Sequence, residues 1–297
     1  MKKILVVGKG LVGEAVESYF KKTPNEIKAC SSSEMDLRIL SEIQSELRNF
    51  KPDVAIFAAG ISGGIEANLQ KPGDLAVQNL LMISNFLFAA QEYKVPQLLN
   101  LVPACVYPAN LHRRLKPRDL FASPMEDSSL AYSTAKLAGL VTCQALASQY
   151  DLSWKSVVIT NLYGTSNKQK TMKPHVIPDL ISKFQSAKAR NAAQIELFGN
   201  GLPVRDFLHV SDLGAAIEKI LTYAGSEKII NINGSGEVTI AELAIEIAKI
   251  TKYKGEIKFS GSEMNGADFK VLDGTEIQEL GWKPRISLQQ GLQFLMK

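Results

Sequence analysis

Gly8-Lys9-Gly10-Leu11-Val12-Gly13 follows the apolar run Ile4–Val7 and opens a segment with helical periodicity. A GxGxxG string in this strand–turn–helix context is typical of a dinucleotide-binding fold. Gly8 permits the tight turn, Gly10 lets the backbone approach a pyrophosphate, and Gly13 allows close packing of helix on strand. The start of the helix supplies free N–H groups for the anion. This stretch therefore predicts a Rossmann-type unit.

Short apolar runs alternate with helix-period segments through the first half of the chain. The expected strands are Ile4–Val7, Ile27–Cys30, Val54–Ala58, Leu98–Val102 and Lys155–Thr160, and the expected helices lie near Leu11–Lys21, Ile39–Phe50, Leu75–Tyr93 and Tyr132–Gln149. This alternation indicates βαβ units in a parallel sheet with helices on both faces. We predict an α/β fold, a Rossmann-type doubly wound parallel sheet with a smaller C-terminal α/β substrate domain.

The alternation ends at Gly164, where a Lys-rich loop at 166–173 leads into a helix near Val176–Ser186 and a strand at Ile195–Phe198. A chain of 297 residues lies in the range where one core splits into two. We expect residues 1–163 to form the dinucleotide-binding domain, with 206–227 returning to it, and 164–297 to form the substrate domain. Two helix caps are expected, at Ser211-Asp212 before Leu213–Tyr223 and at Thr239 before Ile240–Ile250.

Charge and composition exclude several classes of protein. The net charge is +4, and no basic run exceeds His112-Arg113-Arg114, so we expect no nucleic-acid partner. The longest uncharged stretch, Leu75–Gln91, is interrupted by polar residues and is expected to be a buried helix, too short and too polar for a membrane span. Met1-Lys2-Lys3 leads directly into a strand without a signal peptide, which predicts a cytoplasmic protein.

The three cysteines indicate neither disulfides nor a metal site. Cys30, Cys105 and Cys143 lie 75 and 38 positions apart, and no HExxH string occurs. We therefore expect no metal.

The end of the second strand bears on the choice of cofactor. Cys30 is followed by three serines and no carboxylate that would bind the ribose 2′-hydroxyl of NAD; Glu34 and Asp36 come slightly late. Three hydroxyls and Lys9 suit a 2′-phosphate, although no Arg accompanies them. The pattern favours NADP weakly over NAD.

Tyr132 and Lys136 form a YxxxK pair on one face of an expected helix. A positioned phenol can give its proton to a developing alkoxide, and a neighbouring ammonium is expected to lower the phenol's pKa and to bind the nicotinamide ribose. Alone the pair could be an exposed helix pair. After a dinucleotide turn and a series of strands, it is typical of short-chain dehydrogenases.

At this point the chain resembles the extended short-chain dehydrogenase/reductases that act on nucleotide sugars, and among them the GDP-L-fucose synthase (GDP-4-keto-6-deoxymannose 3,5-epimerase-4-reductase) family. The resemblance runs along nearly the whole chain. It rests on Gly63-Gly64-Ile65-Glu66-Ala67-Asn68 after Ala58-Ala59-Gly60, Gln78-Asn79, Cys105-Val106-Tyr107-Pro108, Thr160-Asn161-Leu162-Tyr163-Gly164, His175-Val176-Ile177-Pro178, Gly199-Asn200-Gly201, Arg205-Asp206-Phe207-Leu208-His209-Val210 and Leu280-Gly281-Trp282.

The resemblance implies a chemistry for four residues. A base and an acid on opposite faces of a 4-keto sugar invert C3 and C5 through an enolate, and Cys105 and His175 match the family's base and acid. Both side-chain types are expected to titrate near neutrality, a thiol when a cation is near. Tyr132, with Lys136, would protonate O4 as NAD(P)H reduces C4. The cofactor-binding residues so implied are Gly8, Gly10, Leu11, Val12, Gly13, Asp36, Leu37, Ala58, Ala59, Gly60, Asn79, Tyr132, Lys136, Asn161, Leu162 and His175.

The implied partner is a nucleotide-diphosphate sugar. Arg205 matches the family's arginine on the diphosphate, and Lys183 stands where the family more often has Arg. The remaining expected substrate residues are Asn161, Val176, Phe198 and Lys270. The resemblance also implies a homodimer, formed by pairing Leu75–Tyr93 and Tyr132–Gln149 across a two-fold axis.

The chain departs from the family just before its cysteine. Two serines are usual there, and this chain has Pro103 and Ala104. Proline offers neither hydroxyl nor N–H, and losing one donor to an oxyanion costs on the order of 10²–10³ in turnover. Another hydroxyl or a water replaces the donor, the enzyme is slow, or the substrate is a different 4-keto sugar.

Three functions stay open. The first is an NAD(P)H-dependent nucleotide-sugar 3,5-epimerase/4-reductase of the GDP-L-fucose synthase type, making a deoxysugar for a surface polysaccharide. The second is a C4-reductase or epimerase of a related keto-sugar without double epimerisation. The third is a non-catalytic dinucleotide-binding sensor or scaffold.

Overall fold

A parallel sheet forms the centre of the larger lobe. The computed structural model describes residues 1–165, 175–261 and 266–296, so the predicted loop at 166–173 lies outside the described residues. Within them, six parallel strands follow the order β2 (Glu26–Cys30), β1 (Lys3–Val7), β3 (Val54–Phe57), β4 (Gln97–Pro103), β5 (Ser153–Ile159) and β9 (Ile229–Ile232). The prediction of an α/β Rossmann-type fold is confirmed.

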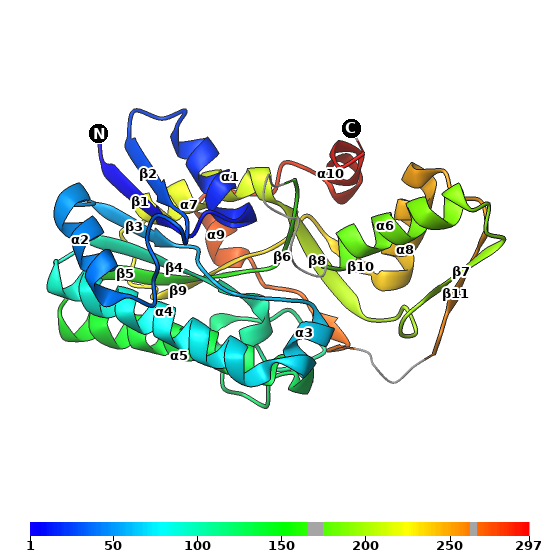
Figure 1. Ribbon diagram of the computed structural model, residues 1–297, viewed down its shortest axis with the longest axis horizontal. Helices are drawn as coiled ribbons and strands as arrows, with labels where there is room; N and C mark the ends of the chain where they lie inside the picture. The colour runs from blue at the N-terminus through cyan, green and yellow to red at the C-terminus, as the bar shows by residue number, and fades with distance from the viewer. Residues whose placement is uncertain (166–174, 262–265, 297) are drawn as a thin grey trace.

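Helices cover both faces of this sheet (Figure 1). One face carries α1 (Leu11–Phe20), α7 (Leu213–Thr222) and α9 (Thr275–Glu279); the other carries α2 (Leu40–Phe50), α4 (Pro72–Glu92) and α5 (Leu130–Gln149). Neighbouring strand residues point to opposite faces: Leu5 and Val7 pack toward α4, Ile4 and Val6 toward α1 and α7. The continuous apolar run is therefore buried on both sides.

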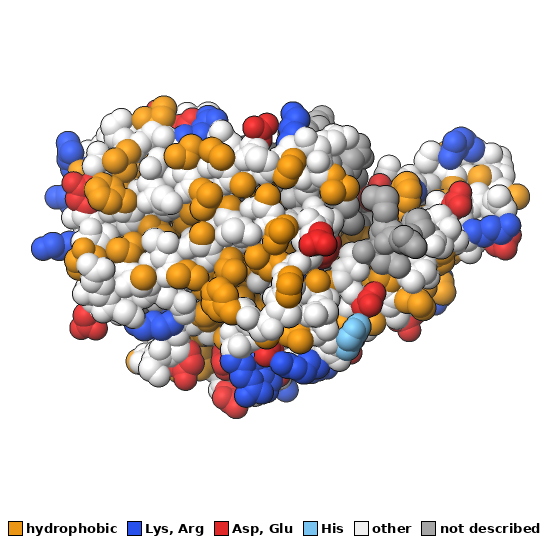
Figure 2. Space-filling model, turned by 90° about the horizontal axis from the view of Figure 1, so that it is seen from below, with side chains coloured by type: hydrophobic (Ala, Val, Ile, Leu, Met, Phe, Trp, Pro, Cys, Tyr) orange, Lys and Arg blue, Asp and Glu red, His pale blue; other side chains and the backbone are white. Residues whose placement is uncertain are grey.

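Helix α4 differs from its expected character. It has 21 residues, and a window of it reaches a mean hydropathy of 1.2, so by length and composition alone it could cross a membrane. The prediction that this stretch is too short and too polar for a span is wrong. Because α4 packs on the sheet beside α5, 44% of that window is buried. Its other side leaves Val77, Leu81 and Phe88 exposed on a face rich in hydrophobic side chains (Figure 2).

The smaller lobe is built from mixed strands and three packed helices. Strand β8 (Val204–His209) pairs with β6 (Asn161–Tyr163), β10 (Glu237–Thr239) and β12 (Phe269–Lys270), while β7 (Gln194–Leu197) pairs with β11 (Glu256–Phe259). A separate apolar cluster lies between α6 (Val176–Ala189), α8 (Ile240–Thr251) and α10 (Leu288–Phe294). Short elements complete the described structure: α3 (Ile65–Gln70), η1 (Ala104–Val106), η2 (Pro117–Asp119), η3 (Asp127–Ser129) and η4 (Val210–Asp212).

One predicted helix cap is present and one is not. Thr239 caps α8 in a full capping box with Glu242. Asp212 precedes α7 but makes no capping bond; its carboxylate accepts the backbone N–H groups of Arg285 and Ile286, both at 2.9 Å. Aspartate is a common helix cap, but here the Asp212 carboxylate binds residues 285 and 286 and not the start of α7.

Residues beyond the predicted segment 206–227 also belong to the large lobe. α7 packs on α1, and β9 then adds a strand to the large sheet, with α9 packed against it. Residues 206–209 belong to β8 in the smaller sheet. The two-domain division at residue 164 remains a prediction.

Candidate active site

The glycine turn leaves room for a dinucleotide. Gly8 has φ +95°, and a Cβ there would lie 2.7 Å from the Cα of Ala59. A Cβ on Gly13 would lie 1.8 Å from the carbonyl oxygen of Gly8, whereas one on Gly10 would meet nothing within 4 Å. No side chain caps the N-terminus of α1. Open space over Gly10 and uncapped N–H groups at Leu11 and Val12 fit a pyrophosphate.

A carboxylate reaches back to the end of β2. Glu34 Oε2 accepts the Ser31 N–H at 2.8 Å and the Ser31 hydroxyl at 2.7 Å, and the hydroxyls of Ser31 and Ser33 are 2.9 Å apart. The sequence suggested no carboxylate at the end of β2, because Glu34 lies four residues beyond Cys30, the last residue of the strand. The turn after the strand folds the Glu34 side chain back onto Ser31.

Lys9 of the glycine turn and Arg38, which follows the serines after β2, are both engaged by carboxylates. Lys9 Nζ lies 3.4 Å from Glu17. Arg38, which the sequence analysis missed, binds Asp36 at 2.5 Å and holds the pKa of that carboxyl at about 2. The sequence signal for Arg38 is an arginine two residues after an aspartate that was itself predicted to bind the cofactor.

The loop after β3 is fixed by Asn79. This side chain donates to the carbonyls of Ile61 and Leu75 at 2.8 and 2.7 Å, and it accepts the Ile61 N–H at 3.1 Å. Expected cofactor residues Ala58, Ala59 and Gly60 begin this loop, whereas Leu37 is buried in the core beneath the sheet. Asn79 thus positions the loop through its backbone.

Tyr132 and Lys136 project from α5 toward that loop. Lys136 Nζ donates to the Ala59 carbonyl at 2.7 Å and lies 6.0 Å from the centroid of the Tyr132 ring. Burial lowers the pKa of Lys136 to about 8. Burial also raises the pKa of Tyr132, and the nearby Cys105 adds to this rise, so the expected lowering of the phenol's pKa is wrong. A neutral phenol suits a proton donor.

Cys105 lies in η1, close to the Tyr132–Lys136 pair and to the predicted substrate residue Lys270. Burial raises the pKa of its thiol, against the opposing effects of the Lys270 charge, a hydrogen bond with Ser133 and the charge of Lys136. The expectation that this thiol titrates near neutrality is therefore wrong for the free protein. The structure does bring Cys105, Tyr132, Lys136 and Lys270 within electrostatic range of one another.

Glu126, which the sequence did not reveal, lies between two of the three expected basic substrate residues, Lys270 and Arg205. Its carboxylate binds Lys270 Nζ at 2.8 Å and accepts the Ala267 N–H at 3.3 Å. Burial would raise the pKa of Glu126, but Lys270 holds it at about 2. A Cβ on Gly266 would lie 3.1 Å from Arg205 Nη2 and 3.2 Å from Glu126 Oε1, so both side chains border this glycine. The signal that could have revealed Glu126 is that a buried lysine requires a carboxylate.

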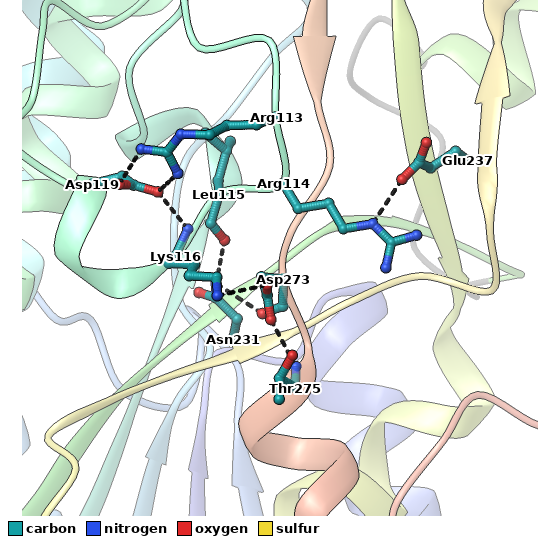
Figure 3. Close-up of polar contacts among 9 residues, drawn as sticks. All are labelled: Arg113, Arg114, Leu115, Lys116, Asp119, Asn231, Glu237, Asp273 and Thr275. Carbon is teal, nitrogen blue, oxygen red and sulfur yellow. Dashed lines mark hydrogen bonds and ion pairs between the residues drawn. The ribbon is translucent and has the colours of Figure 1, made fainter.

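The first part of the loop between η1 and α5 is held against the smaller lobe (Figure 3). The same loop also carries Glu126. Leu115 pairs with the second lobe through its N–H to Val271 and its carbonyl from Asp273, both at 2.9 Å, and Asn231 donates to the same carbonyl at 2.8 Å. Arg114 binds Glu237 of β10 at 2.8 Å, whereas Arg113 binds Asp119 within the loop. These contacts join the first part of the loop to the segment after β12, and Glu126, further along the loop, binds Lys270 of β12 directly.

The segment after β5 joins the two lobes at the end of the sheet. Asn161 donates to the carbonyl of Asp206 at 3.1 Å, and Leu162 packs against the core of the large sheet. A Cβ on Gly164 would lie 3.6 Å from Leu11 Cδ1, which places the end of β6 beside the glycine turn.

The remaining predicted substrate residues lie on the smaller lobe. His175 heads α6 with an exposed side chain, although desolvation by its surroundings lowers the pKa of the imidazole. Val176 packs on the smaller core. Lys183 binds Asp179 at 2.7 Å and lies 5.3 Å from the centroid of the Phe198 ring, which is 75% exposed. The structure thus pairs Lys183 with Phe198, and no described contact joins His175 to Cys105.

Fold and site together define a class. A glycine turn shaped for a dinucleotide and a Tyr–Lys pair on α5 both contact Ala59 in the loop after β3, as in the extended short-chain dehydrogenase/reductases. The NAD dependent epimerase/dehydratase family matches residues 4–233.

Curated relatives narrow the family. The chain is 34% identical to the GDP-L-fucose synthase of Sinorhizobium fredii over 98% of its own length and 93% of the relative's. It is 33% identical to the GDP-L-fucose synthase of Escherichia coli, covering 98% and 94%. This chain belongs to the GDP-L-fucose synthase family of extended short-chain dehydrogenase/reductases.

A solved structure shows the same architecture. The GDP-mannoheptose C4 reductase of Campylobacter jejuni, with NADP bound, superposes with a TM-score of 0.87 at 26% identity, covering 99% of this chain and 97% of that one. Among the described residues, no group of three His, Cys, Asp or Glu could hold a metal ion.

Proposed function

We propose that the protein is an NAD(P)H-dependent nucleotide-sugar 3,5-epimerase/4-reductase acting on a GDP-4-keto-6-deoxyhexose. The observation that carries this proposal is the meeting of Cys105 with Tyr132, Lys136 and the Lys270–Glu126 pair. A reductase needs the phenol and the ammonium, whereas a thiol beside them serves proton exchange at carbon.

The chain's residues divide the work by position. Tyr132, neutral at physiological pH, donates its proton to O4, and Lys136 holds its charge near the phenol while it donates to the Ala59 carbonyl. Cys105 removes the C–H proton on one face of the sugar, and His175 supplies one on the other. Arg205, Lys183 and Phe198 bind the diphosphate and base, with Asn161, Val176 and Lys270 completing the pocket. A bound nicotinamide dinucleotide supplies the hydride for C4.

A reaction in D₂O tests the proposal. The protein is incubated with GDP-4-keto-6-deoxymannose and reduced cofactor, nicotinamide absorbance is followed, and the product is analysed by NMR. Cofactor oxidation with deuterium at C3 and C5 is expected. Tyr132→Phe is expected to abolish oxidation and leave deuterium exchange, because it removes the O4 donor only.

The second candidate is a C4-reductase that does not epimerise. The similar Campylobacter jejuni protein bears that description, and Pro103 replaces a donor that the family uses. Oxidation of cofactor without deuterium in the product would favour this candidate. Cofactor binding with no oxidation of either reduced cofactor by any keto-sugar would favour a sensor or scaffold.

For the cofactor, we propose NADP(H) in preference to NAD(H). The serines after β2 and Lys9 support it, as does the NADP in the Campylobacter jejuni structure. The Glu34 carboxylate at Ser31 acts against it, because it repels a 2′-phosphate. We therefore expect Glu34→Gln to raise the ratio of kcat/KM for NADPH to that for NADH, with Glu256→Gln, at an exposed position of β11, as a surface control. An unchanged ratio would show that Glu34 does not face the ribose.

We further propose a cytoplasmic homodimer that supplies a surface polysaccharide with its deoxysugar. The exposed apolar residues of α4 support the dimer, since they would be covered by the same helices of a second copy. Sedimentation of Phe88→Glu tests it: a monomer is expected, and an unchanged dimer would place the contact elsewhere.

A further inference from the structure

Two basic side chains of the expected substrate site border one acid, Glu126. Glu126 Oε2 lies 2.8 Å from Lys270 Nζ, and the two side chains are 15% and 8% exposed. Arg205 borders Gly266 from the other side, so its guanidinium and the Glu126 carboxylate face the same backbone position. The guanidinium donates to the carbonyl of Val204 at 2.9 Å and forms no ion pair with any carboxylate in the described part of the chain.

The other carboxylates near Arg205 are placed differently from Glu126. Asp268 and Asp206 lie within electrostatic range of the guanidinium. Asp268 is exposed, so water and salt screen its charge. The Asp206 carboxylate is buried and accepts two donors at the junction of the lobes. Within residues 1–165, 175–261 and 266–296, Glu126 is therefore the one carboxylate that bonds either of the two cations.

Glu126 does not depend on Lys270 for all of its hydrogen bonds. Its Oε2 also accepts the Ala267 N–H at 3.3 Å, and its Oε1 accepts the Ser128 hydroxyl. Each carboxylate oxygen thus keeps a donor if another anion takes Lys270 Nζ, and no buried acceptor is left unsatisfied. An ammonium has three N–H donors, of which Glu126 uses one. Lys270 can therefore be shared with, or passed to, a second anion.

We propose that Glu126 competes with the diphosphate of the substrate for Lys270 and Arg205. The inference rests on the proposed function, in which both residues line the nucleotide-sugar pocket. In the free protein, the carboxylate neutralises a buried ammonium that would otherwise lack a counter-charge. In the complex, the diphosphate brings two negative charges of its own, and the Glu126 carboxylate repels them at close range. Glu126 thus stabilises the empty site and weakens the filled one, which favours release of product.

Binding of GDP-mannose tests the proposal without chemistry, because this sugar has no keto group to reduce. In isothermal titration calorimetry, Glu126→Gln is expected to lower the Kd about tenfold, the effect of removing one repulsive charge at close range. Asp268→Asn is the matched control: it removes an exposed carboxylate within range of Arg205 and is expected to change the Kd by no more than about twofold. An unchanged or raised Kd in Glu126→Gln would overturn the proposal, as would an equal gain in the control.

A Lys270→Met background tests the same charge if Glu126→Gln alone does not fold. Lys270→Met is expected to weaken GDP-mannose binding, because it removes a cation and keeps the competing carboxylate. The double variant Glu126→Gln/Lys270→Met removes both members of the buried pair, and it is expected to bind about tenfold more tightly than Lys270→Met. Equal affinity of these two proteins would overturn the proposal.

Turnover separates this proposal from the proposed function. Glu126→Gln is expected to lower KM for the keto-sugar without raising kcat, whereas loss of a purely structural contact would raise KM. If the wild type binds GDP-mannose but reduces no keto-sugar, the proposed activity fails and the Kd values still decide the role of Glu126. Reduction with equal KM and equal Kd in both proteins would overturn the competition and leave the activity standing. Failure of both proteins to bind GDP-mannose would also overturn it.

Discussion

For single residues of the site, sequence spacing predicted position but not ionisation. The YxxxK spacing predicted that Tyr132 and Lys136 share a helix face, and both lie beside the loop after β3. Spacing did not predict their ionisation, because it carries no information on burial. Desolvation, not the neighbouring ammonium, determines the pKa of the Tyr132 phenol.

Lys136 is expected to set an upper pH limit for reduction. Its pKa is lowered to about 8, so its charge is present below that pH and is lost above it. We expect kcat/KM for reduction to fall as pH rises through 8. Lys136→Arg, which keeps a positive charge at all these pH values, is expected to extend the plateau at a lower rate. An unchanged fall in that variant would assign the limit to another group.

Glu126 and Lys270 are expected to stabilise the fold as a pair. The two side chains are mostly buried and 2.8 Å apart, so Glu126→Gln leaves a buried ammonium without its counter-charge. We expect a loss of about 3 kcal/mol in the free energy of unfolding, measured with urea. The double variant Glu126→Gln/Lys270→Met is expected to lose less. Equal losses would show that the unpaired charge is not the cause.

At the scale of elements, hydrophobic periodicity was sufficient for most of the fold. The strands and helices of the first half lie within a few residues of their predicted positions, because each strand is buried on both faces and each helix on one. Periodicity does not reveal the partner of a side chain. The same reasoning placed caps at Thr239 and Asp212, and only Thr239 forms one, since residues 285 and 286 bind Asp212.

The cap of α8 gives a prediction at this scale. Thr239 Oγ1 accepts the Glu242 N–H at 3.1 Å, and the Glu242 carboxylate accepts the Thr239 N–H at 2.8 Å. Thr239→Ala is expected to cost about 1 kcal/mol in unfolding free energy, and Thr239→Ser much less. Urea denaturation of the three proteins measures this difference. A loss of the same size in Thr239→Ser would point to the methyl group.

At the scale of the molecule, the lobes meet through buried polar contacts. Asp206, in β8, accepts the hydroxyl of Thr160 and the N–H of Gly234, the latter at 2.6 Å. Thr160 follows β5 and Gly234 follows β9, so one carboxylate joins the ends of two strands of the large sheet. No periodicity or motif predicted this junction, because it depends on three distant segments.

Asp206 is expected to make stability depend on pH. Burial raises its pKa from 3.8 to about 6, so the folded state holds this proton more tightly than the unfolded state. The contribution is present below pH 4 and is lost as pH rises through 6, by up to about 3 kcal/mol. Asp206→Asn is expected to remove this dependence in urea titrations between pH 4 and 8. A wild-type slope in the variant would assign it elsewhere.

The outer position of β9 constrains how such a chain can be rearranged. A stop codon after residue 163 would deliver a polypeptide that lacks β9, α7 and α9, and so leaves β5 as a bare edge. An exposed edge strand invites aggregation. Segments of the second half of the chain alternate between the two lobes. Recombination between related genes therefore preserves the fold only when the whole second half is transferred together. The two lobes are poor candidates for independent exchange.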